Sequence, residues 1–132
     1  MTHRILLPPG WPRPKGYSNG VSARGRTIYT AGVVGWDAQE RFVADTLTGQ
    51  FAQVLRNIVA ILAVDGAGPE HLVRLTCYVT DRDAYVAGLA EIGAHWKTII
   101  GRHYPAMALV EVSRLVDPKA LVEIEATAVV PA

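Results

Sequence analysis

The feature that most constrains the fold is a helical apolar period that begins near residue 45. Between Asp45 and Asp65, apolar side chains recur at steps of three and four residues, which gathers them into one stripe on a helix. The stripe comprises Leu47, Phe51, Val54, Leu55, Ile58, Ile61 and Leu62. Asp45 or Thr46 can cap the start of this helix, and Gly66 can end it in the left-handed conformation. Such a stripe must be buried against another layer of structure.

After this helix the chain changes to the two-residue period of strands, then to a helix, then to strands again. The second helix is predicted from Asp81 or Asp83 to about Ile100, with Gly101 at its end. Its stripe comprises Tyr85, Leu89, Ile92, Trp96 and Ile99. The segments with strand-like alternation are 71–80, 105–115 and 120–130.

The N-terminal part is rich in proline and glycine. Residues 1–16 hold four prolines and two glycines, so they are predicted to form an extended arm with at most a short strand at 4–7. Residues 21–23 and 27–31 are predicted to pair as a hairpin around Arg24–Arg26. A chain of 132 residues suits one domain, which we expect to span residues 1–132.

The order of elements predicts an α+β fold in which two helices pack on one face of a mixed sheet. Side-chain alternation then assigns the two faces of the late strands. The helix-side positions are predicted to be Val73, Leu75, Cys77, Val79, Ala108, Val110, Val112, Val122, Ile124, Ala126 and Ala128. The opposite face is mixed, with Arg74, Thr76, Tyr78, Met107, Leu109, Glu111, Ser113, Glu123, Glu125 and Thr127. Such a face is either solvated or meets other subunits, and its apolar positions favour self-association.

Composition excludes several classes of protein. The formal net charge is +1 and no basic stripe is present, which argues against a nucleic acid as the main partner. The single Cys77 excludes an internal disulfide and is expected to lie in the core, and the four histidines are too scattered for a metal site. We therefore expect no cofactor. No secretory signal or membrane-spanning run is recognised, so we expect a cytoplasmic protein with no membrane partner.

Six segments together resemble the Rid family, also called the YjgF or reactive-intermediate-deaminase family. They are GYSNGV (16–21), IYTAGVVGWD (28–37), QVLRNIVAILAVDGAG (53–68), LVRLTCYVTD (72–81), PAMALVEV (105–112) and LVEIEATAVV (121–130). The resemblance covers nearly all of the chain after the arm. It implies a chorismate-mutase-like fold and a homotrimer whose sheets enclose a central barrel, with a small-molecule cleft at each subunit boundary.

The resemblance also implies roles for particular residues. Glu125 matches a glutamate that positions the water attacking an imine carbon, and Tyr17 matches a tyrosine of the cleft. Tyr85 and Gly32 match further cleft positions. Where relatives of the founding branch carry an arginine that holds a substrate carboxylate, this chain has Met107, which offers no hydrogen-bond donor.

Other residues of the predicted cleft also favour an apolar ligand over a small acid. Trp36, Tyr85, Met107 and Leu109 would together line a larger and more apolar pocket. His103 can approach the cleft and relay a proton or hold an anion, or it is a surface loop residue. Other interpretations also remain: Trp36 can pack under its own loop, Tyr17 can be a buried tyrosine, and Glu125 can be a structural carboxylate.

Three functions follow from these observations. The first is an enzyme that hydrolyses or tautomerises an imine, an enamine or a related activated carbon–nitrogen compound. The second is a non-catalytic trimeric protein that binds or senses an apolar metabolite. The third is a nucleic-acid function, which the near-neutral charge disfavours.

Overall fold

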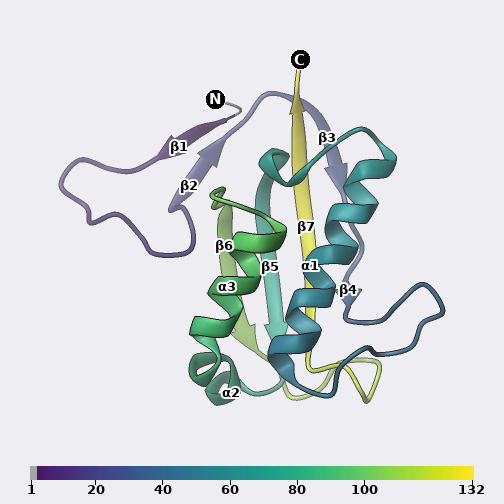
Figure 1. Cartoon of the computed structure of the whole chain (residues 1–132). Coiled ribbons are helices and arrows are strands. Elements are labelled where there is room, and N and C mark those ends of the chain that lie inside the picture. Colours follow the sequence, from purple (N-terminus) through teal and green to yellow (C-terminus); the bar gives the residue numbers. More distant parts are fainter. Residues whose placement is uncertain (1–2) are drawn as a thin grey trace.

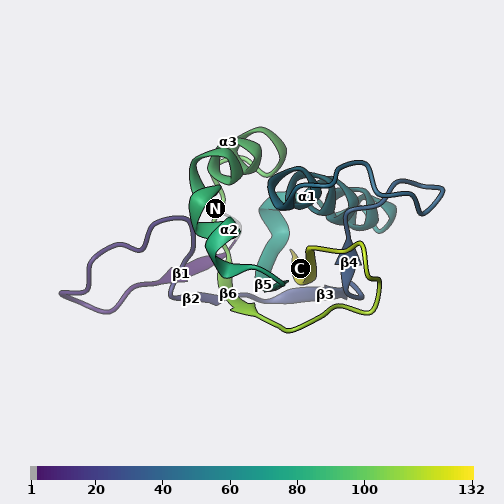
Figure 2. The ribbon, with the colours of Figure 1, turned by 90° about the horizontal axis from the view of Figure 1, so that it is seen from below.

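A computed structural model describes residues 3–132 and has the predicted α+β architecture, with the helices on one face of a mixed sheet (Figures 1 and 2). The central strand β7 pairs antiparallel with β3 and β4 on one side and with β5 on the other, and β6 lies parallel to β5 at the edge. These strands are β3 (Gly25–Tyr29), β4 (Val33–Val34), β5 (Leu72–Val79), β6 (Ala106–Glu111) and β7 (Val122–Pro131). The parallel pair needs a long crossover, which the helices after β5 provide.

The first predicted helix is confirmed as α1 (Leu47–Val64). Thr46 caps it, because its side chain accepts a hydrogen bond from the backbone N–H of Gly49 at 3.2 Å. Gly66 follows the helix with a φ of +72°, which is the left-handed conformation expected there. A short 3-10 turn, η1 (Pro69–His71), then leads into β5.

The second predicted helix is present but interrupted. It consists of α2 (Arg82–Ala87) and α3 (Leu89–Ile99), which meet at Gly88. Asp81 caps the start of α2 by accepting a hydrogen bond from the N–H of Ala84. The break turns α3 so that Ile92 and Trp96 are buried in the core.

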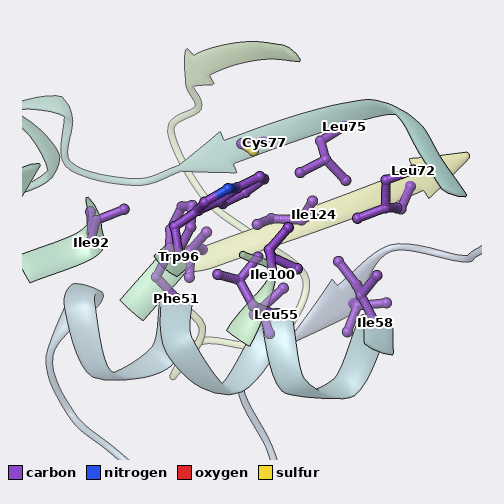
Figure 3. Close-up of a cluster of buried hydrophobic side chains, with 14 of the residues drawn as sticks. Phe51, Leu55, Ile58, Leu72, Leu75, Cys77, Ile92, Trp96, Ile100 and Ile124 are labelled. Atoms are coloured by element: carbon purple, nitrogen blue, oxygen red, sulfur yellow. The ribbon is translucent and has the colours of Figure 1, made fainter. Parts of the chain in front are cut away.

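The core lies between the helices and the sheet (Figure 3). Leu55 and Ile58 of α1 and Trp96 of α3 pack over Leu75 and other side chains of the central strands. Cys77 is fully buried there, as predicted, and burial raises the pKa of its thiol to about 12. By length and composition α1 resembles a membrane span, but its apolar stripe, except for the exposed Ile61, is part of this core.

The predicted hairpin is wrong. β2 (Gly20–Ser22) pairs with β1 (Arg4–Leu6), and β3 pairs with the C-terminal strand β7. Gly25 lies against β7 so closely that a Cβ there would be 1.9 Å from the Val130 carbonyl oxygen. This glycine therefore marks a close approach to a distant strand, whereas the sequence analysis took it as part of a local turn.

The predicted faces of β6 are also wrong. Its parallel register sets Met107 beside Leu75 and Leu109 beside Cys77, so both side chains lie on the helix side and pack against the core. Val110, predicted to be covered, is 45% exposed. Every residue from 106 to 110 is apolar, so alternation within this strand carries no signal and the pairing with β5 decides the faces.

Two further face assignments change for similar reasons. Glu111 lies on the same side as Met107, and its carboxylate accepts a hydrogen bond from the N–H of Arg82 at the start of α2. In β5 an irregularity between Leu72 and Arg74 buries Leu72 completely and leaves Val73 half-buried. The predicted helix-side positions of β7 are confirmed, since Val122, Ile124, Ala126 and Ala128 are all buried.

Gln50 joins three parts of the fold and generates a stability prediction. Its buried side chain donates to the carbonyls of Ala44 and Lys119 and accepts from the N–H of Leu121. Substitution Gln50→Leu leaves these backbone groups without partners, so we expect the free energy of unfolding to fall by roughly 2–4 kcal/mol in a urea titration.

Gln53→Leu on the same helix is the matched control. The side chain of Gln53 bonds only the side chains of Asn57 and Arg56, which can turn to water instead. A loss below about 1 kcal/mol is expected. Equal losses for the two variants would contradict the bridging role of Gln50.

Candidate ligand site

A cavity of about 670 Å³ lies between α3, the edge strand β6 and residues 15–17. Its wall is largely apolar and aromatic, and three polar side chains, Lys15, Tyr17 and Lys97, also line it. The other aromatic and large apolar side chains are Phe51, Tyr85, Leu89, Ile92, Trp96, Tyr104, Met107 and Leu109. The structure thus brings together four residues that the sequence analysis assigned to the site: Tyr17, Tyr85, Met107 and Leu109.

The loop between α3 and β6 is held at several points. The indole N–H of Trp96 donates to the carbonyl of His103 at 3.1 Å, and the Trp96 ring stacks on Tyr104 at a centroid distance of 6.2 Å. Nε2 of His103 lies 2.7 Å from the carbonyl oxygen of Leu72. These contacts fix Tyr104 in the cavity wall, directly before the strand that carries Met107.

Ser18 explains the position of Tyr17. The N–H of Ser18 donates to the carbonyl of Pro105 at 3.0 Å, and its hydroxyl donates to the carbonyl of Tyr104. The serine is buried, so these bonds attach residues 17–19 to the start of β6. Tyr17 remains 43% exposed and its side chain lines the cavity.

Glu125 lies on the opposite, helix-free face of the sheet. It is exposed, between the buried Ile124 and Ala126 of β7, and accepts a hydrogen bond from the hydroxyl of Tyr78 at 2.7 Å. Gly32 belongs to the same region, because a Cβ at this position would be 2.3 Å from Oε2 of Glu123. One chain therefore carries Glu125 and Gly32 on one side of its sheet and the apolar cavity on the other.

Trp36 and His103 do not line this cavity. Trp36 is half-buried at the far edge of the sheet, where its ring lies 5.9 Å from that of Phe42 and Asn57 donates to its carbonyl. His103 lines a second cavity, next to Tyr17 and Tyr104.

Some residues of the region were missed by the sequence analysis. Tyr78 was assigned to the mixed face without a role, although the antiparallel alignment of β5 and β7 places it opposite Glu123 and two residue pairs from Glu125, on the same face. Lys15 and Lys97 were not considered, because a lysine in a loop or a helix end resembles any solvated residue. Trp96 was recognised only as part of a helix stripe.

The chemistry of the two faces differs. The cavity offers burial and aromatic contact with cations at its margin, whereas the opposite face offers an oriented carboxylate. Because Tyr78 donates to one oxygen of Glu125, the second oxygen remains for a water molecule. Within residues 3–132, no group of three or more His, Cys, Asp or Glu side chains is placed to hold a metal ion.

The fold and the cavity define a small α+β protein with an apolar ligand pocket beside an edge strand. A family model described as Endoribonuclease L-PSP matches residues 12–130. A RutC family protein of Synechocystis is 34% identical over 99% of each chain. The chain belongs to this family, the Rid or YjgF family.

Two more relatives are similar over most of this chain. The crystal structure of YyfB from Yersinia pestis, a Rid family protein of unknown function, has 35% identity and a TM-score of 0.86 and covers 98% of this chain and 100% of its own. A Salmonella typhimurium protein named 2-iminobutanoate/2-iminopropanoate deaminase is 32% identical over 86% of each chain.

The Tyr78–Glu125 contact leads to a titration prediction. The hydrogen bond to Glu125 and the negative charges of Glu125 and Glu123 disfavour the phenolate and raise the pKa of Tyr78 above 10.0, the ordinary tyrosine value. Glu125→Gln removes the nearest charge, so the pKa of Tyr78 should fall. NMR of ring-labelled tyrosine measures this shift directly.

Glu123→Gln is the control for that titration. Its charge also raises the pKa of Tyr78, but without a hydrogen bond, so the fall should be smaller than for Glu125→Gln. An unchanged pKa of Tyr78 in Glu125→Gln would show that the two side chains do not interact in solution.

Proposed function

We propose that this protein is a Rid-family enzyme that acts on an imine, an enamine or a related activated carbon–nitrogen compound with an apolar or aromatic body. The observation that carries this proposal is the lining of the 670 Å³ cavity, where Met107 and Leu109 lie beside aromatic side chains. A wall of this kind binds a ligand by burial and stacking. The proposal places this chain in a branch of the family without the carboxylate-binding arginine.

Glu125 and the apolar cavity lie on opposite faces of one chain, which supports a site assembled from two subunits. Glu125 and Gly32 lie on the helix-free face, which also exposes Tyr29 and Val110. When this face packs against the β6 edge of a second copy, Glu125 of one subunit can approach the cavity of the next. A homotrimer with a cleft at each boundary has this arrangement, as the family resemblance implies.

The reaction needs a positioned water and a proton path. Glu125 would take a proton from water as the oxygen attacks the imine carbon. The nitrogen of the tetrahedral intermediate receives this proton from Glu125 and then the proton of the new hydroxyl group. The C–N bond breaks as the C=O bond forms, so imine and water give a carbonyl compound and ammonia. Tyr17, at the margin of the cavity, would orient the ligand.

The alternative is a trimeric binding protein that keeps the cavity and lacks turnover. The same apolar lining supports it, because burial alone gives affinity. The word endoribonuclease in the family description does not by itself extend to this chain. A net charge of +1 gives little attraction for RNA.

Glu125→Gln separates the enzyme from the binding protein. The imine of phenylalanine, generated by an amino-acid oxidase, is the probe, and ammonia release is followed. Loss of the carboxylate should lower kcat about 100-fold or more, while the affinity for phenylpyruvate changes little. Glu40→Gln, in an exposed loop, is the matched control. Equal rates for wild type and Glu125→Gln would contradict a catalytic role.

Met107→Arg tests the preference of the cavity. A charge-assisted contact is worth roughly 2–5 kcal/mol, so an arginine at this position should raise kcat/KM for 2-iminopropanoate, a short acid with few other atoms to bind, by about thirtyfold or more. The ratio of kcat/KM between variant and wild type measures this change, and Met107→Leu, which adds no donor, should leave kcat/KM near the wild-type value. Wild-type turnover of 2-aminoacrylate as fast as that of arginine-bearing relatives would contradict the proposed preference.

A further inference from the structure

A second cavity, of about 510 Å³, lies between the N-terminal strand, the β1–β2 loop and the loop that precedes β6. It is adjacent to the first cavity, since Tyr17 and Tyr104 line both. Figure 1 shows the β1–β2 loop leaving the body of the protein and returning toward β2. The ligand cavity described above does not include the cationic side chains found here.

Among the described residues, the polar lining of the second cavity consists of potential hydrogen-bond donors and holds no carboxylate. Arg13 and Arg102 contribute two guanidinium groups, and His3 and His103 contribute two imidazoles. Neither arginine forms an ion pair with any residue in the described range 3–132. Asn19 and Ser18 are the remaining polar side chains apart from the tyrosines.

The two imidazoles are held in the same way. Nε2 of His3 lies 3.3 Å from the carbonyl oxygen of His71, and Nε2 of His103 lies 2.7 Å from that of Leu72, the next residue. A carbonyl oxygen only accepts, so Nε2 carries the proton in both rings. Each ring therefore has Nδ1 left for another partner.

The burial of His3 is the observation that points to a ligand. The residue is only 7% exposed, and its Nδ1 is a buried side-chain nitrogen without a hydrogen-bond partner in residues 3–132. Leaving a buried polar atom unpaired is unfavourable, so native proteins rarely do it without a reason. Nδ1 is closed to a water-sized probe, so a ligand in the cavity that His3 lines would become its partner through a shift of the ring or of the side chains that cover it.

We propose that this second cavity is an anion site that binds the carboxylate or phosphate group of a small molecule through Arg13, Arg102 and the Nδ1 atoms of His3 and His103. Guanidinium groups match the paired oxygens of either anion. Nδ1 accepts from a ligand hydroxyl when the ring is neutral, and donates to an oxyanion when the ring is protonated. The site is independent of the imine chemistry proposed for the first cavity.

The direct test follows the histidine ring nitrogens of the full chain by NMR. Inorganic phosphate and acetate are titrated separately at constant pH and ionic strength. The Nδ1 signals of His3 and His103 should shift and saturate, while His95, which pairs with Glu91 on α3, should not respond. Tighter binding of phosphate would assign a phosphate-bearing ligand, and tighter binding of acetate a carboxylate. Absence of saturation with both anions would overturn the proposal.

Charge-neutral variants test the arginines. Arg13→Gln and Arg102→Gln should each raise the Kd of the better anion about tenfold, because each removes one charge-assisted contact. Arg24→Gln makes the same charge change at an exposed arginine outside the cavity and should leave the Kd unchanged. Equal effects of all three variants would show that only the net charge of the protein matters and would reject the site.

His3→Phe separates a ligand role from a structural one. It keeps a ring in the buried position and removes only the long bond to His71. The melting temperature without anion should therefore change little, whereas the rise produced by phosphate or acetate should be lost. Persistence of that rise in His3→Phe would remove His3 from the site and contradict the proposal.

Discussion

The pairing of β5 with β6 is the constraint on which the rest of the site depends. A shift of one residue in this register would turn every side chain of β6 to the other face. As the strands are paired, Met107 and Leu109 lie beside Leu75 and Cys77, under the helices, and they become part of an apolar cavity. Glu125 two strands away is on the other face, so this register places the apolar cavity and the Glu125 carboxylate on opposite sides of the sheet.

The loop before β6 is held by hydrogen bonds from three parts of the chain. The loop carries Tyr104 into the cavity wall, and it is bonded by Trp96, by Ser18 and, through the His103 ring, by the carbonyl of Leu72. These partners come from α3, the N-terminal segment and β5. A displacement of any of them would change the cavity that Met107 lines. Cavity shape is therefore a property of the whole edge of the sheet.

Much of the fold could be predicted from the sequence, because α1 and the strand β7 have unambiguous apolar periods. The failures have physical causes. Residues 106–110 are all apolar, so their faces depend on a distant partner strand, and Gly25 serves a contact with β7 that no local pattern reveals. Gln50 was not recognised because its backbone partners come from two segments, one before α1 and one before β7, that are far apart in the sequence.

The site was predictable only as far as family resemblance reached. Alternation in β7 places Glu125 on the helix-free face, as the structure shows. No local pattern shows that Met107 and Leu109 lie on the other face, in one cavity with Tyr17 and Tyr85.

The two cavities differ in the groups that could bind an acid. Met107 in the first cavity offers no hydrogen-bond donor to a carboxylate. Arg13 and Arg102 line the second cavity, and Tyr17 and Tyr104 line both. An anion held there would leave the first cavity to apolar groups, whether the anion belongs to the same ligand or to another. Because Tyr17 and Tyr104 line both cavities, a rotation of either ring changes the shape of both.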